Sequence, residues 1–292
     1  MAQDFTSPLA NIAYAREVIA AYNLQAKKSF GQNFLINDAI VKKTIALAQV
    51  SPGDFVTEIG PGYGTLTVAL VRCGANVLAV EKDAKMINAL VDNLEKFCPE
   101  GKEHIDVLRC DALKIDFDAY SRKLGESPLK MVSNLPYNVA APIVITYFQK
   151  LSNLKDATVM VQKEIAQRMA AKPGNKNYGA YTVKLAMYAD AIDSFDVSRN
   201  NFIPAPRVDS SVIKLVRHDR IKPKIAAKAC LIADGAFAHR RKTIANSLKE
   251  YFCEDTIMLE KIFAAFKAAG VSLELRAEAL EPTEYAKIAQ EL

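Results

Sequence analysis

The feature that most constrains this 292-residue chain is an alternation of strand-like and helix-like segments between residues 55 and 171. Short apolar runs typical of buried strands lie at 55–60, 76–83, 105–112, 129–134 and 157–162. Segments that read as helices lie between or after them, at 65–73, 84–97, 140–151 and 163–171. Because parallel strands need a long crossover, which is usually a helix, this order predicts an α/β fold with a doubly wound parallel sheet.

The pattern changes after residue 171 and again after residue 218. Two strand-like runs, 191–198 and 209–218, are joined by the proline-rich stretch RNNFIPAPR without a helix, so we expect them to end the sheet in antiparallel fashion. From residue 219 the pattern is purely helical. We therefore expect an N-terminal extension of unassigned role (1–26), the α/β domain (27–218) and a smaller all-helical domain (219–292).

Composition limits the setting in which such a chain works. Apolar runs are far shorter than the ~20 residues that a membrane span needs, and the N-terminus lacks the basic and apolar regions of a signal peptide. Five widely spaced cysteines without a CxxC pair predict thiols in a reducing cytoplasm, with no disulfide frame and no metal site. The net charge is +5, yet residues 218–292 hold 12 basic against 11 acidic residues. Any nucleic-acid contact there must therefore be a local patch.

Four residues fall at the ends of successive predicted strands: Gly60, Glu81, Asp111 and Asn134. Each has a plainer explanation, such as a tight turn at the glycines or a solvated strand end. However, the carboxyl ends of parallel strands share one rim, where doubly wound sheets bind ligands. The loop EIGPGYGTL has Thr65 where a dinucleotide fingerprint needs glycine. The pattern therefore favours a nucleoside cofactor that lacks a pyrophosphate, namely S-adenosylmethionine.

The fourth strand ends in an unusual turn, Asn134, Leu135, Pro136 and Tyr137. The exocyclic amine of a base is a poor nucleophile because its lone pair is delocalised into the ring. If the Asn134 side-chain oxygen and the Pro136 carbonyl each accept one N–H, the lone pair is directed at a methyl donor. Leu135 supplies the spacing, and Tyr137 can stack on the base. We therefore interpret residues 134–137 as a catalytic acceptor turn.

These residues carry a family resemblance over about residues 27–250. NLPY is similar to the [N/D/S]-P-P-[Y/F/W]-type motif of amino-methyltransferases, and the chain resembles the small-subunit ribosomal RNA adenine dimethyltransferases in KKSFGQNFL, EIGPGYGTLT, NLPYNVAAPI, MVQKEIAQRM, FIPAPRVDSSV and AFAHRRKTIANSL. The resemblance implies a Rossmann-like methyltransferase sheet that dimethylates N6 of two adjacent adenines near the 3′ end of small-subunit rRNA during ribosome biogenesis. It also implies that S-adenosylmethionine is contacted by Asn33, Leu35, Gly60, Glu81, Asp111 and Asn134.

Two further sites follow from the resemblance or from charge. Phe202 is expected to form a second aromatic wall for the base, the alternative being a hydrophobic anchor for its loop. The run His239, Arg240, Arg241 and Lys242 suggests phosphate contacts, the alternative being a solvated helix face. The expected partner is small-subunit rRNA within a 30S assembly particle, bound by a cytoplasmic monomer that needs neither membrane nor metal.

Three alternatives stay open on the sequence. A macrolide-resistance methyltransferase of large-subunit rRNA shares the chemistry, but FGQNFL, AFAHRRKTIANSL and the prolines after Phe202 favour the small-subunit enzyme. A non-catalytic RNA- or DNA-binding factor, like the mitochondrial transcription-factor relatives, is disfavoured by the intact NLPY and Glu81. An NAD-dependent dehydrogenase is disfavoured by Thr65.

Overall fold

The computed structural model describes residues 6–24, 33–125, 127 and 129–292, and divides into two units. The first unit comprises Met1–Lys163 and Ile192–Val216, and the second comprises Glu164–Ala191 and Arg217–Leu292. The chain thus changes units three times. The single boundary expected after residue 218 corresponds to the last change alone, and residues 164–191 belong to the second unit.

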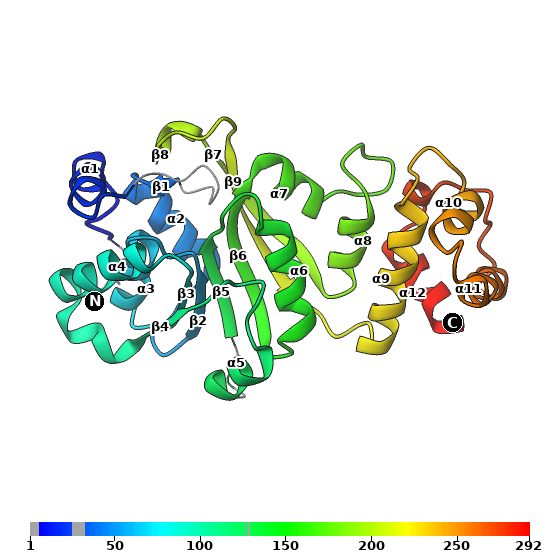
Figure 1. Ribbon diagram of the computed structural model, residues 1–292, viewed down its shortest axis with the longest axis horizontal. Helices are drawn as coiled ribbons and strands as arrows, with labels where there is room; N and C mark the ends of the chain where they lie inside the picture. The colour runs from blue at the N-terminus through cyan, green and yellow to red at the C-terminus, as the bar shows by residue number, and fades with distance from the viewer. Residues whose placement is uncertain (1–5, 25–32, 126, 128) are drawn as a thin grey trace. The chain divides into compact units, whose positions relative to one another are not determined.

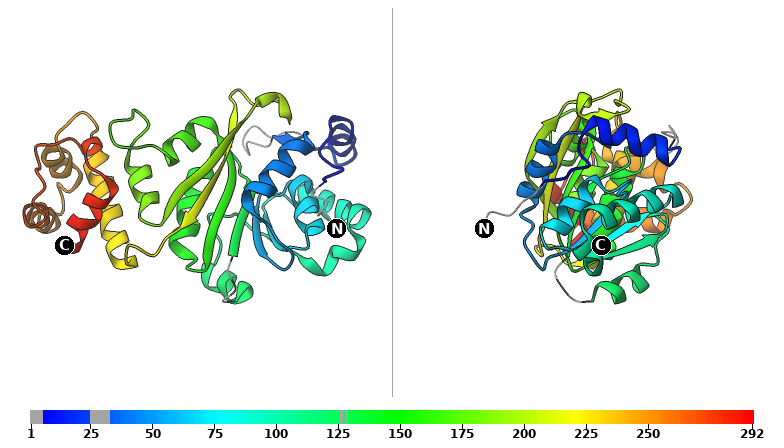
Figure 2. Two further views of the ribbon diagram at one scale, coloured as in Figure 1. Left: turned by 180° about the vertical axis from the view of Figure 1, so that it is seen from behind. Right: turned by 90° about the vertical axis from the view of Figure 1, so that its left-hand side faces the viewer.

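The first unit contains the sheet that the sequence predicts. A seven-stranded sheet has the order β4-β3-β2-β5-β6-β9-β7 (Figure 1). Strands β2 to β6 pair in parallel and β9 pairs antiparallel to β6, which confirms the fold class (Figure 2). The strands are β2 (Phe55–Ile59), β3 (Asn76–Glu81), β4 (Ile105–Arg109), β5 (Leu129–Asn134), β6 (Leu154–Gln162), β7 (Ala189–Val197) and β9 (Ser210–Arg217).

The helices of the first unit carry buried apolar residues. They are α1 (Ile12–Ala21), α2 (Asp38–Ala48), α3 (Thr65–Arg72), α4 (Ala84–Phe97), α5 (Phe117–Leu124) and α6 (Ala140–Lys150), with a 3₁₀ turn at Pro99–His104. Asn37 and Asp83 cap α2 and α4 by accepting backbone N–H bonds, as such residues do at helix starts. Leu9, Ala15 and Val18 lie in the same apolar cluster as α2 to α4. The described part of the N-terminal extension is therefore built into the first unit.

A second, two-stranded sheet escaped the sequence analysis. β1 (Phe34–Leu35) pairs antiparallel with β8 (Phe202–Ile203), which follows a 3₁₀ turn at Arg199–Asn201. Strands of two residues are too short to show a periodic pattern. Their pairing joins segments 167 residues apart and fastens the loop before β9 to the segment after residue 32.

The second unit is helical, as expected for its C-terminal part. It contains α7 (Lys163–Met169, of which Lys163 belongs to the first unit), α8 (Ala180–Ala186), α9 (Pro223–Phe237), α10 (Ile244–Tyr251), α11 (Thr256–Ala268) and α12 (Pro282–Glu291), with a 3₁₀ turn at Ala277–Ala279. Tyr178, Val183 and Met187 share one apolar cluster with α9 to α12. This packing assigns 164–191 to the second unit, although those residues precede the last strands.

The described residues contain no group of three or more His, Cys, Asp or Glu side chains able to hold a metal ion. No helix in this part of the chain is long and apolar enough to cross a membrane.

Candidate cofactor and methyl-acceptor site

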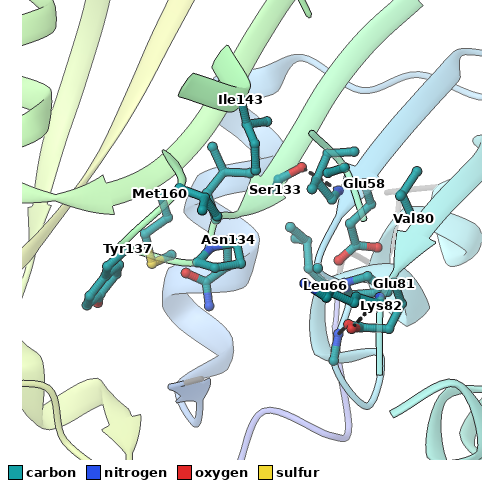
Figure 3. A pocket seen from close by; sticks show the side chains of 18 of the residues that line it. Glu58, Leu66, Val80, Glu81, Lys82, Ser133, Asn134, Tyr137, Ile143 and Met160 are labelled. Carbon is teal, nitrogen blue, oxygen red and sulfur yellow. Dashed lines mark hydrogen bonds between the residues drawn. The ribbon is translucent and has the colours of Figure 1, made fainter. Parts of the chain in front are cut away.

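A pocket of about 270 Å³ opens at the carboxyl ends of the parallel strands. It lies where the strand order reverses, between β3-β2 and β5-β6, which is where doubly wound sheets bind ligands. Figure 3 shows the carboxyl groups of Glu58 and Glu81 on one side of the pocket and Asn134 and Tyr137 on the other. Nine residues predicted from the sequence line it together: Asn33, Leu35, Gly60, Glu81, Asp111, Asn134, Leu135, Pro136 and Tyr137.

The glycine loop (residues 58–66) and the acceptor turn (134–137) both line this pocket. Gly60 has φ +71°, a left-handed conformation that favours glycine. A Cβ atom at Gly60 would lie 3.4 Å from Cδ of Pro136. A side chain at position 60 would therefore occupy the space through which the loop approaches the turn.

Glu81 closes the glycine loop on its β3 side. Its Oε2 accepts the Gly62 N–H at 3.3 Å, and its Oε1 accepts those of Lys82 and Asp83 at 2.8 and 2.9 Å. Burial raises the pKa of Glu81, and these three N–H groups oppose the rise. The carboxyl group is thus fixed by backbone donors before any ligand arrives.

Asp111 is held in its charged form at the end of β4. Its Oδ2 lies 2.8 Å from Nζ of Lys82, and its Oδ1 accepts the Leu113 N–H at 3.1 Å. These two bonds lower the pKa of Asp111, that from Lys82 most. Asp111 therefore supplies a negative charge to the wall of the pocket.

The sequence analysis missed Glu58, a third carboxyl group of the pocket. Glu58 is only 1% exposed, and Thr67 donates its hydroxyl to Glu58 Oε2 at 2.6 Å. Burial raises the pKa of Glu58 to about 8, Thr67 opposes the rise, and Glu81 adds to it. A carboxyl group within an otherwise apolar strand, two residues before Gly60, was the available sign. Glu81 and Asp111, which line the same pocket, suit a cationic ligand such as S-adenosylmethionine.

Asn134 is oriented by its own hydrogen bond. Its Nδ2 donates to the Asn33 carbonyl at 3.3 Å. A carbonyl can only accept, so the amide nitrogen must face Asn33 and Oδ1 faces away from it. None of the described residues donates a hydrogen bond to this oxygen, which remains able to accept one N–H of a substrate.

The rest of the acceptor turn is anchored to two neighbouring strands. Leu135 N–H donates to the Met160 carbonyl of β6 at 3.0 Å, and the Tyr137 hydroxyl lies 2.5 Å from Ser210 Oγ of β9. The Pro136 carbonyl already accepts the Val139 N–H at 3.1 Å. A carbonyl oxygen has two lone pairs, so Pro136 retains one for a substrate.

For Phe202 the structure favours the alternative role. The side chain is 3% exposed, belongs to the apolar cluster of α1 to α4, and does not line the pocket. Its strand β8 pairs with β1, where Phe202 faces Leu35 in register. Phe202 thus packs behind the pocket wall, which supports the alternative of a hydrophobic anchor over an aromatic wall.

The predicted basic run is exposed, but acids of the second unit neutralise most of it. His239 Nε2 lies 2.9 Å from Glu250, Lys242 pairs with the same carboxylate, and Arg240 Nε lies 3.2 Å from Glu278. Arg240 also donates to the carbonyls of Lys176 and Tyr178. Arg241 alone in this run has no ion-pair or hydrogen-bond partner among the described residues.

The N-terminal helix supports the glycine loop through a buried relay. The Tyr14 hydroxyl donates to Asn93 Oδ1 at 2.5 Å, and Asn93 Nδ2 donates to the Tyr63 carbonyl at 2.7 Å. Tyr63 lies between two glycines of the loop. The sequence analysis assigned no role to residues 1–26, because a contact between positions 14 and 93 leaves no local pattern.

Tyr14→Phe is expected to lower the free energy of unfolding by about 1–3 kcal/mol, because it leaves Asn93 Oδ1 buried without a donor. Cofactor affinity should fall as well, since the loop loses a support. Tyr22→Phe is the matched control, because the Tyr22 hydroxyl bonds Asp92 at the exposed surface of the same two helices. Denaturant unfolding and calorimetry measure both quantities, and equal effects of the two variants would contradict the relay.

Glu81→Ala is expected to weaken cofactor binding about 10- to 100-fold, because the cofactor loses charge-assisted hydrogen bonds to the Glu81 carboxylate that are worth roughly 1.5–3 kcal/mol. The loop N–H groups that Glu81 accepts would also lose their partner. Titration calorimetry with S-adenosylmethionine measures the change, with Glu95→Ala, an exposed carboxylate of α4, as control. Unchanged affinity in a folded Glu81→Ala protein would remove Glu81 from the cofactor site.

Comparison with known proteins agrees with this geometry. Ribosomal RNA small subunit methyltransferase A of Magnetococcus marinus is 36% identical over 93% of this chain and 94% of its own. The protein of that name from Streptomyces griseus is 38% identical over 94% and 92%. A dimethyladenosine transferase structure from Plasmodium falciparum shares the fold, with TM-score 0.70, 24% identity and coverage of 87% and 95%.

A structure of the 23S rRNA methyltransferase ErmE also shares the fold, with TM-score 0.63 and 22% identity over 89% of this chain and 99% of its own. The sequence profile of the family described as ribosomal RNA adenine dimethylase matches residues 23–292, which include the whole pocket. The chain belongs to the ribosomal RNA adenine dimethylase family.

Proposed function

We propose that this chain transfers methyl groups from S-adenosylmethionine to the N6 amino groups of two adjacent adenines near the 3′ end of small-subunit rRNA, giving N6,N6-dimethyladenosines during ribosome biogenesis. Its family and its curated relatives support the reaction class and the cofactor. The observation that carries the proposal is that the acceptor turn (134–137) and the glycine loop (58–66) line one pocket.

The residues of the pocket divide the work. When bound, the cofactor supplies an electrophilic methyl group on a sulfonium. Glu81 and Asp111 favour a cation at the β3-β4 side. At the other side, Asn134 Oδ1 and the second lone pair of the Pro136 carbonyl each accept a hydrogen bond from one N–H of the amine.

Holding both protons fixes the amine relative to the ring and directs its lone pair into the pocket. Tyr137 is held by the hydrogen bond between its hydroxyl and Ser210, and it supplies an aromatic ring on which the base can stack. No catalytic base is needed, because a methylated arylammonium is acidic and loses its proton to water.

The substrate within this proposal is a 30S assembly particle, met by a monomer in the cytoplasm without a metal ion. Tritiated S-adenosylmethionine incubated with unmethylated 30S particles or with 50S particles tests it. Label in 30S RNA is expected. Label confined to 50S RNA would identify a large-subunit enzyme, and label in neither would identify a non-catalytic RNA-binding protein.

A further inference from the structure

We propose that Arg199 and Arg207, on the loop 198–209 beside the acceptor turn, bind the rRNA phosphates that flank the target adenine. This inference rests on the proposed function, because it takes the substrate to be RNA whose base enters the pocket. It places a phosphate-binding surface on the first unit, distinct from the basic run 239–242 of the second unit.

The loop is fastened to the pocket wall at both of its ends. At its start, Asn201 accepts the Ile36 N–H at 2.9 Å, and its side chain accepts from Asn37 at 2.7 Å. At its end, Ser210 meets the Tyr137 hydroxyl of the acceptor turn. Arg207 is three residues before Ser210, so its Cα lies within about 11 Å of that of Ser210.

The two arginines are held next to each other. Asp209 Oδ1 accepts the Arg199 N–H at 2.9 Å, and Arg199 Nη1 donates to the Arg207 carbonyl at 3.5 Å. Both side chains belong to exposed residues, and neither forms an ion pair with an acid among the described residues. Two guanidinium groups in one loop repel each other, and an anion between or beside them relieves that repulsion.

Acids near the loop are already engaged with other groups. Asp196 pairs with Lys163 at 2.6 Å and also accepts from Ser211. Asp209 accepts the Arg199 backbone N–H, and its charge helps to raise the pKa of Lys163. The basic run 239–242 of the second unit, by contrast, has acid partners for three of its four residues, His239, Arg240 and Lys242. The loop carries two arginines against one acid, Asp209, so it presents a net positive charge.

An RNA phosphate fits this arrangement better than a protein surface does. A guanidinium group matches the oxygens of a phosphate in two parallel bonds, and phosphate contacts fix the register of a nucleic acid without reading its sequence. A base that enters the pocket brings its own neighbouring phosphates to the rim. Arg199, whose backbone N–H is held by Asp209, and Arg207 would bind the strand at that rim while Tyr137 receives the base.

The test measures binding to unmethylated 30S particles, and to an isolated RNA stem-loop carrying the adenines, at several salt concentrations. For Arg199→Ala/Arg207→Ala we expect the slope of log K against log salt to flatten by roughly 1.4–1.8, with weaker binding at low salt. Cofactor affinity should stay unchanged. The control is Arg122→Ala/Lys123→Ala on α5, which also removes two cations and lies at the other end of the sheet from β8 (Figure 1).

Arg207→Gln guards against a loop that fails to fold, because the Arg207 side chain forms no hydrogen bond or ion pair with the described residues and only its carbonyl accepts a bond. This variant alone should flatten the slope by roughly 0.7–0.9. Wild-type slopes in both variants would overturn the inference, and so would a loss seen with the particle but not with the stem-loop, which would indicate a ribosomal protein. A third outcome is that the wild type methylates 30S RNA while both variants show the wild-type slope of log K against log salt. That result would contradict only this inference and leave the proposed function intact.

Discussion

Asn134→Ala is expected to lower the rate of methyl transfer to 30S particles by about 100-fold or more, since the amine then loses one of the two acceptors that orient it. The turn itself should persist, because Leu135 bonds Met160 and Tyr137 bonds Ser210 without help from the Asn134 side chain. Binding to 30S particles should change little, because phosphate contacts dominate affinity for RNA. Single-turnover assays with labelled cofactor measure the rate.

Asn134→Asp is the matched variant, because a carboxylate oxygen can still accept an N–H where alanine cannot. We expect Asp at this position to retain more activity than Ala at equal cofactor saturation. Cofactor affinity must be measured for both variants, since Asn134 also lines the cofactor pocket. Transfer by Asn134→Ala within a few-fold of the wild-type rate would refute the acceptor turn.

Glu58→Gln is expected to remove a large pH dependence of stability. Burial raises the pKa of Glu58 to about 8 in the folded protein, against 4.5 for the free side chain. The folded state therefore holds a proton that the unfolded state releases, and this contribution to stability is fully present below pH 4.5. It is lost as the pH rises through about 8, by up to about 1.4 kcal/mol per pH unit.

A neutral amide at position 58 can still accept the Thr67 hydroxyl, and it does not ionise. We compare the free energy of unfolding of Glu58→Gln with that of the wild type at two pH values. From pH 4.5 to pH 8, this difference should shift in favour of Glu58→Gln by several kcal/mol, on the order of 4. Urea unfolding from pH 4.5 to 8.5 measures this, with Glu95→Gln, an exposed carboxyl group, as control. Parallel pH curves for wild type and Glu58→Gln would mean that Glu58 is ionised in the folded protein.

The sequence predicts the sheet and most of the pocket for one physical reason. Parallel strands linked by helices place their carboxyl ends on one rim, so residues far apart in sequence, such as Gly60, Asp111 and Asn134, could be brought together from local pattern alone. Asn33 and Leu35 came from the family resemblance, and the structure places both in the same pocket.

Where the structure differs from the sequence analysis, contacts between segments distant in sequence are the reason. Phe202 resembles an active-site aromatic in its motif, yet pairing of β8 with β1 buries it. Residues 164–191 follow the sheet helices in sequence but share their apolar cluster with α9 to α12. The charge of 239–242 depends on Glu278, which follows the run by 36 residues and is invisible to a count within it.

The most direct test of the central claim is to map the methyl groups that the protein places on unmethylated 30S particles. The labelled RNA would be cut into defined fragments, digested to nucleosides and analysed by mass spectrometry. The proposed function predicts N6,N6-dimethyladenosine at two adjacent adenines near the 3′ end, absent with Asn134→Ala. Methyl groups on another base, on another atom of adenine or elsewhere in the RNA would contradict it.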